Sequence, residues 1–123
     1  MGFHIRVAFY GLIATASVVC TGAAVSAQAQ VKETVLYSFS DGSDGGNPFA
    51  PLIADETGAL YGTAELGGIS NSACFGPCGV FFKLTAPPAR QPPWSETTLW
   101  SFTGGNDGAS PFGGLFARND SPS

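Results

Sequence analysis

The sequence predicts an all-β protein made of antiparallel four-stranded repeats that form β-propeller-like blades. Residues 33–54 (ETVLYSFSDGSDGGNPFAPLIA) return 63 positions later as residues 96–117 (ETTLWSFTGGNDGASPFGGLFA), with 12 identities in 22 aligned positions. In addition, short alternating segments separated by Gly-rich turns fill the chain after residue 30, and none has helical periodicity. Because one such unit cannot bury its own apolar face, we expect copies to stack on one another. A β-sandwich is the main alternative, but it does not predict this repetition.

Four strands are expected within one repeat, at residues 31–39, 52–55, 59–63 and 79–84. They define a first β repeat at residues 30–85. The segment APPARQPP at residues 86–93 is expected to be a Pro-rich linker, because its prolines lack the amide hydrogen that a strand ladder needs. Residues 94–123 then restart the pattern as a partial second repeat. The chain therefore contains about one and a half repeats, and one interpretation is a truncated remnant of a longer repeat protein.

The first 29 residues have the pattern of a secretory signal peptide. His4 and Arg6 precede an apolar run over residues 7–20, and small residues lead up to Ala27 and Ala29. We expect cleavage after Ala27 or Ala29, and a secreted or cell-surface product. A retained membrane anchor is the alternative, but a span needs about 20 apolar residues and this run is shorter. No membrane insertion is expected once the leader is removed.

The charge balance excludes two classes of partner. The whole chain has a formal net charge of -4, and the part after residue 29 sets four Lys and Arg residues against nine Asp and Glu residues. Nucleic acids and anionic membrane surfaces both require clustered basic residues, and the sequence has no such cluster. The aromatic content of 12% is too high for a disordered chain. We therefore expect a folded acidic domain that does not bind nucleic acid.

Two cysteines follow the leader, in the segment Cys74-Phe-Gly-Pro-Cys78. An even number of cysteines in an exported chain predicts a disulfide, and Gly76-Pro77 favours the tight turn that brings the two residues together. The alternatives are a redox pair and a zinc site. A redox pair more typically has two intervening residues at a helix start, and zinc needs two further ligands.

The residues available for catalysis are few. His4, inside the leader, is the only histidine, so Ser-His-Asp and Cys-His catalysis and His-ligated metals are excluded after cleavage. The remaining acid–base candidates are carboxylates that recur at equivalent positions, such as Asp44 with Asp107 and Glu33 with Glu96. Recurrence once per repeat indicates a structural role rather than two unlike carboxyl groups in one site. We therefore expect no enzymatic activity.

Calcium is the one cofactor for which ligands are available. Asp41, Asp44 and Asp107 lie in the Gly-rich loops, and calcium binds carboxylate oxygens in such loops. However, Gly104 stands in the second copy where the first has Asp41. The favoured interpretation is that Asp44 and Asp107 bind nearby backbone amides and hold their turns. On that interpretation the protein needs no cofactor.

Six aromatic residues, of which Tyr37 with Trp100 and Phe49 with Phe112 recur 63 positions apart and Trp94 has no repeat partner, allow two interpretations. They are Tyr37, Tyr61, Trp94, Trp100, Phe49 and Phe112. Such residues usually fill the core between stacked units, although exposed rings also bind sugars. A carbohydrate-active protein would also need an unrepeated carboxylate beside an exposed ring, and Glu65 is the candidate for that role. Core packing is the expectation.

The segments LYSFSDGSDGGNPFAPLIADETGALYGTAELGG, CGVFFKL and WSETTLWSFTGGNDGASPFGGL resemble the GloVer tandem repeat. The resemblance covers nearly all of residues 33–115, and departs from the repeat pattern after Leu115. It implies an exported bacterial protein with β-propeller-like repeats, and it carries no enzymatic activity. The resulting hypothesis is a non-catalytic binding or surface-display scaffold whose ligand is unknown and which can pack against itself or against further repeats. The alternative is a secreted carbohydrate-binding or carbohydrate-active protein.

Overall fold

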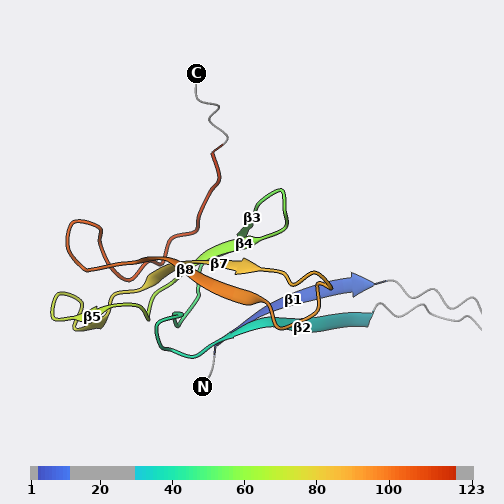
Figure 1. Cartoon of the computed structure of the whole chain (residues 1–123), viewed down its shortest axis with the longest axis horizontal. Helices are drawn as coiled ribbons and strands as arrows, with labels where there is room; N and C mark the ends of the chain where they lie inside the picture. Colours follow the sequence, from blue (N-terminus) through green and yellow to red (C-terminus); the bar gives the residue numbers. More distant parts are fainter. Residues whose placement is uncertain (1–2, 12–29, 119–123) are drawn as a thin grey trace, which may run out of the picture.

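The structure, a computed structural model, describes residues 3–11 and 30–118 (Figure 1). Eight β-strands and no helix occur within these residues, and every strand pair is antiparallel. The prediction of an all-β fold is therefore confirmed. The expected cleavage sites at Ala27 and Ala29 lie outside the described residues.

A four-stranded sheet forms the centre of the molecule. Its order is β3 (Ile53–Ala54), β4 (Leu60–Ala64), β7 (Val80–Thr85) and β8 (Ser95–Ser101). Each strand pairs with the next strand of the sheet along the chain, which gives a simple meander. The segment expected as a linker, residues 86–93, is the loop that joins β7 to β8.

A second sheet consists of β1 (Phe3–Gly11) and β2 (Gln30–Phe39). The strands expected at residues 31–39, 52–55, 59–63 and 79–84 are all found, but they do not form one sheet. β2 pairs with residues of the expected leader, and β8 supplies the fourth strand of the central sheet. The observed four-stranded sheet therefore begins and ends later in the chain than the expected repeat at residues 30–85, because β7 pairs with β8.

A small hairpin projects from one end of the central sheet. It consists of β5 (Ser70–Asn71) and β6 (Gly76–Pro77). Cys74 in the connecting turn forms a disulfide with Cys78, which follows β6, and their Cα atoms lie 5.3 Å apart. The side-chain amide of Asn71 donates a hydrogen bond to the carbonyl oxygen of Thr103 at 2.7 Å. The disulfide turn is therefore attached to the loop that follows β8.

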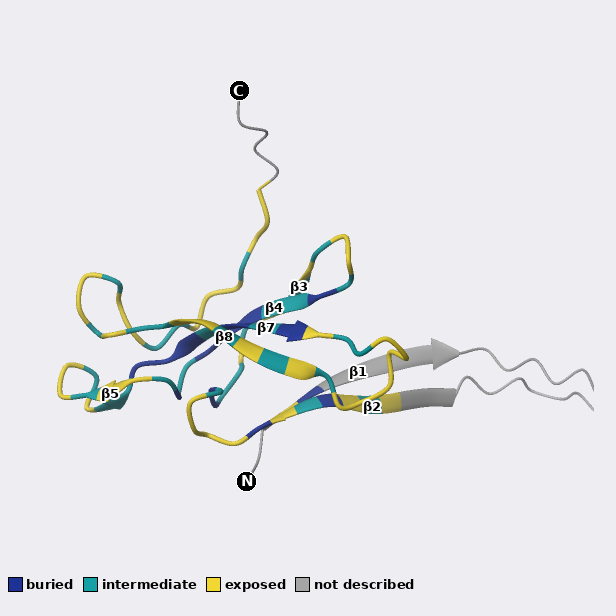
Figure 2. Ribbon diagram, viewed as in Figure 1, coloured by how far each residue is buried: buried dark blue, intermediate teal, exposed yellow. Residues whose placement is uncertain are grey.

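The core lies between the two sheets, where Figure 2 shows the buried residues. Phe82 and Leu84 of β7 are fully buried and belong to the same cluster as Leu36 and Phe39 of β2 and Ile5 of β1. The rings of Phe39 and Phe82 meet edge to face, with centroids 5.0 Å apart. One face of the central sheet thus packs on the β1–β2 hairpin.

Gly62 shows how closely this core is packed. A Cβ atom at this position of β4 would lie 2.7 Å from Cζ of Phe82, which is closer than real side chains approach. The absence of a side chain at Gly62 therefore lets the Phe82 ring pack close to the backbone of β4.

Candidate functional site

The Gly-rich loop after β2 is organised by Asp44. Its carboxylate accepts hydrogen bonds from the Tyr37 hydroxyl at 2.9 Å, the Ser40 amide at 2.9 Å and the Ser40 hydroxyl at 2.6 Å. Burial alone would raise the pKa of Asp44, but the bonds from Ser40 and Tyr37 outweigh it and hold that pKa below its usual value. The pKa of Tyr37 is raised to about 12, first by burial and then by the Asp44 carboxylate.

The loop after β8 has the same arrangement 63 positions later. Asp107 accepts hydrogen bonds from the Trp100 indole at 3.2 Å, the Thr103 amide at 3.0 Å and the Thr103 hydroxyl at 2.6 Å. The Thr103 and Trp100 bonds keep the pKa of Asp107 below its usual value. Both carboxylates therefore serve as acceptors that close a turn, as expected from sequence.

The calcium candidates are not gathered into one site. Both carboxylate oxygens of Asp44 and of Asp107 already accept hydrogen bonds within their own turns. Asp41 is exposed and has a left-handed φ of 62°. Across residues 3–11 and 30–118, no group of three or more His, Cys, Asp or Glu side chains is placed to hold a metal ion. Asp44 and Asp107 thus have a visible structural function, and within the described residues the three aspartates belong to no shared cluster.

A third carboxylate turn, which the sequence alone did not indicate, joins β3 to β4. Asp55 accepts hydrogen bonds from the amide and hydroxyl of Thr57 at 2.9 and 2.6 Å, from the Ala59 amide at 3.0 Å and from the Tyr61 hydroxyl at 2.9 Å. The Thr57 bond is the main reason that the pKa of Asp55 falls to about 2. The turn is thereby fixed to the ring of Tyr61.

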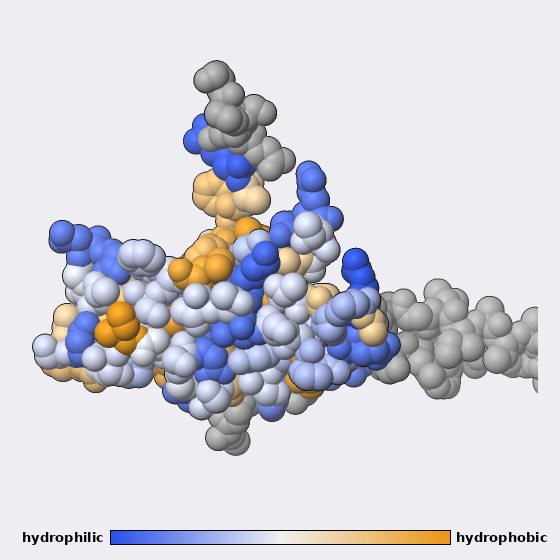
Figure 3. Space-filling model, viewed as in Figure 1, coloured by the Kyte–Doolittle hydropathy of each residue, from blue (hydrophilic) through white to orange (hydrophobic). Residues whose placement is uncertain are grey.

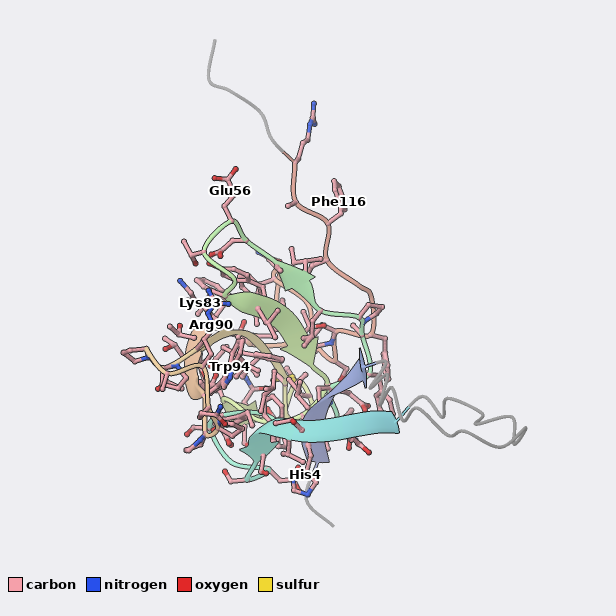
Figure 4. The ribbon with its side chains drawn as sticks, turned by 90° about the vertical axis from the view of Figure 1, so that its right-hand side faces the viewer. His4, Glu56, Lys83, Arg90, Trp94 and Phe116 are labelled. Carbon is pink, nitrogen blue, oxygen red and sulfur yellow. A yellow bond between two sulfur atoms is a disulfide. The ribbon has the colours of Figure 1, made fainter. Side chains whose placement is uncertain are left out.

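This turn forms one wall of an open groove of about 700 Å³. The floor is the outer face of the central sheet, where Tyr61 and Phe81 stack with ring centroids 6.3 Å apart and with planes inclined by 28°. The opposite wall is the C-terminal segment, from which Phe116 projects in Figure 4, across from Glu56 of the turn. Figure 3 shows apolar surface at the base of this segment. The groove therefore combines an aromatic floor with acidic residues on one wall.

A positive charge lies beside this floor. Nζ of Lys83 is 5.4 Å from the centroid of the Tyr61 ring, a distance at which a cation is attracted to the ring face. Lys83 and Tyr61 are also direct cross-strand partners on β7 and β4. Their side chains consequently share the outer face of the sheet.

The predicted core role of the aromatic residues holds for only part of the set. Tyr37 and Trp94 pack against the buried cluster, as expected. In contrast, the side chains of Phe49, Trp100 and Phe112 are 65, 54 and 60% exposed, so the core prediction is wrong for them. Trp100 is exposed because it lies on the face of the central sheet that the β1–β2 sheet does not cover. Phe49 and Phe112 lie instead in the loops after β2 and β8, where their rings stack on each other.

Glu65 does not join the groove. It is half-buried beside β4, where its carboxylate accepts a hydrogen bond from the Asn47 side chain at 3.3 Å. The groove instead contains Asp55 and Glu56. Sequence reasoning missed these two residues because it treated 56–58 only as a hairpin turn, and the strands that line the groove meet only in the folded sheet.

Comparison with protein-family models, curated proteins and solved structures finds no match for this chain. Among the residues that the structure describes, no helix has the length and the hydropathy of a membrane span. The side chains and surfaces described above are therefore the basis for inferring a function.

Proposed function

We propose that the chain is a non-catalytic, exported repeat protein of the GloVer type that acts as a binding or display scaffold. The observation that carries this proposal is the repeated turn: Asp44 and Asp107, 63 positions apart, accept equivalent sets of three hydrogen bonds. Two of the recurring carboxylates that were acid–base candidates are thus used to hold loops. Such use is typical of a repeated architecture rather than of an active site.

The disulfide between Cys74 and Cys78 supports export, because disulfides persist mainly in oxidising compartments. Export would remove residues 1–29 and with them β1, the one strand that pairs with β2 in the described residues, so the edge of β2 that β1 covers would be open in the mature chain. A blade-like unit with an open edge and an open aromatic face is suited to association rather than to enclosing a small substrate.

Export is tested by expressing the chain with a C-terminal epitope and measuring the intact mass of the product outside the cytoplasm. We expect a chain that begins at Gln28 or Gln30. The variant Val18→Asp, which interrupts the apolar run of the leader, should stay inside and keep Met1, whereas Val35→Asp, outside the leader, should be exported and cleaved like the wild type. An exported product that still begins at Met1 would contradict the proposal.

Carbohydrate binding is the second candidate, and the groove favours it. Stacked Tyr61 and Phe81 rings beside Asp55 offer the combination of an apolar surface and hydrogen-bond acceptors on which sugars bind. Glycan-array binding by the wild type that is lost in Phe81→Ala but kept in Phe75→Ala would support this candidate. Phe75 is a suitable control because its side chain is fully exposed on the disulfide turn, outside the groove.

A further inference from the structure

The two sheets pair their strands in the same register. On β2, Tyr37 faces Ile5 and Val35 faces Arg6, with a register shift between Ile5 and Arg6. On β8, the residues 63 positions later repeat this pattern: Trp100 faces Phe81 and Thr98 faces Phe82, with a shift between Phe81 and Phe82. β1 therefore occupies on β2 the position that β7 occupies on β8, with the bulge at the same place.

The two equivalent pairs differ in what covers them. Ile5 is 8% exposed and, with Tyr37, packs in the core that contains Phe82 of the central sheet. The Phe81–Trp100 pair lies on the opposite face of the central sheet, where Trp100 is 54% exposed. The Ile5–Tyr37 pair thus shows which surface binds a residue pair at this position of the strands: the face of a four-stranded sheet on which Phe82 lies.

The groove lies where such a covering sheet would sit. Its floor includes Phe81 and Tyr61, and one wall is formed by residues 115–117, which align with residues 52–54 at the start of the covering sheet. Phe116 of this wall is 82% exposed. The groove thus has an apolar floor, a wall that aligns with the first segment of the covering sheet, and unoccupied space beside that wall. In these features it matches the surface that β1 and β2 present to the central sheet.

We propose that the outer face formed by Tyr61, Phe81 and Trp100 binds the Phe82 face of a second copy of this chain. In the full chain, the incoming Phe81–Trp100 pair would replace the Ile5–Tyr37 pair of that second copy, and one apolar cover is exchanged for another. In the exported chain, removal of residues 1–29 would take Ile5 away and leave its place open. The contact joins unlike surfaces, so association is head to tail. This inference deepens the proposed scaffold function by naming its partner.

Sedimentation velocity of the full chain over a range of concentrations tests the contact. Trp100→Asp should weaken association about tenfold or more, because it places a charge at the centre of the interface. Ile5→Asp should strengthen association, because it loosens the copy's own cover on Phe82. The matched control Phe75→Asp adds the same charge at a fully exposed apolar residue away from this face, and should associate like the wild type.

A mixing experiment establishes the direction of the contact and does not depend on Ile5. The Trp100→Asp variant retains its Phe82 face, so an excess of it should cap wild-type chains and reduce large species to dimers. Near-ultraviolet circular dichroism identifies any variant that has lost its packed core.

The inference is overturned if the wild type and Ile5→Asp stay monomeric, or if Trp100→Asp associates as strongly as Phe75→Asp. Monomeric behaviour of an exported, correctly cleaved product would overturn the inference and leave the export proposal intact.

Discussion

Residues 33–54 and 96–117 have closely similar sequences but differ in burial. Leu36 is 5% exposed, whereas its equivalent Leu99 is 43% exposed. Phe39 is 3% exposed, and its equivalent Phe102 is only half-buried. The local features agree, since both segments contain a strand, a bulge and an aspartate-centred turn. The comparison shows that local sequence determines the strand and turn, while burial depends on which sheet packs over them.

The first prediction uses the matched leucines and has the largest expected effect. Leu36→Ala should lower the free energy of unfolding by about 2 to 5 kcal/mol, because it leaves a cavity in the core. Leu99→Ala should lower it by less than about 1 kcal/mol, as expected for a partly exposed site. Urea unfolding of dilute protein, followed by fluorescence, measures both values. Equal losses would show that the two segments have the same environment in solution.

The second prediction compares the aspartate turns. Asp44→Ala should cost about 1 to 3 kcal/mol of unfolding free energy, because it leaves the half-buried Tyr37 hydroxyl and the Ser40 amide without their acceptor. Asp107→Ala removes equivalent bonds from a more exposed region, and we expect a smaller loss. The same urea experiment measures the difference. A larger loss for Asp107→Ala would place the more important turn in the second segment.

The third prediction concerns alkaline pH and only the first segment, because Trp100 stands where the first segment has Tyr37. The pKa of Tyr37 rises from 10.0 to about 12 on folding. The corresponding stability is fully present below pH 10 and is lost as pH rises through 12. Tyr37→Phe should flatten the dependence of the unfolding free energy on pH between 10 and 12. If Tyr37→Phe and the wild type lose stability in parallel, the Tyr37–Asp44 bond is not the cause.

The fourth prediction has the smallest expected effect and concerns Asp55, whose equivalent in the second segment is Arg118. The pKa of Asp55 falls from 3.8 to about 2 on folding, so its contribution is present above pH 3.8 and is lost as pH falls towards 2. Asp55→Asn should reduce the acid sensitivity of the unfolding temperature between pH 4 and 2. Glu56→Gln, in the same turn but exposed, is the matched control and should behave like the wild type.

The sequence predicted the all-β class and the positions of the main strands because alternation and Gly-rich turns are local signals. It also identified Asp44 and Asp107 as turn residues, since their bonds lie within seven positions. It did not predict that residues 3–11 pair with β2, because alternation indicates a strand without naming its partner. The groove was missed for a related reason: Phe81 and Phe116 approach only after β3, β4 and β7 have assembled.

The stacked rings of Phe49 and Phe112 carry a geometric consequence. These residues are 63 positions apart, and their centroids lie 6.2 Å apart with planes inclined by 24°. When equivalent residues of successive units touch, the movement that superimposes one unit on the next leaves these residues almost in place. That movement is therefore mainly a rotation, and its axis passes close to the point of contact. Further units added by the same operation would turn about that axis with their phenylalanines side by side. A ring or a tight spiral would result, rather than a straight rod.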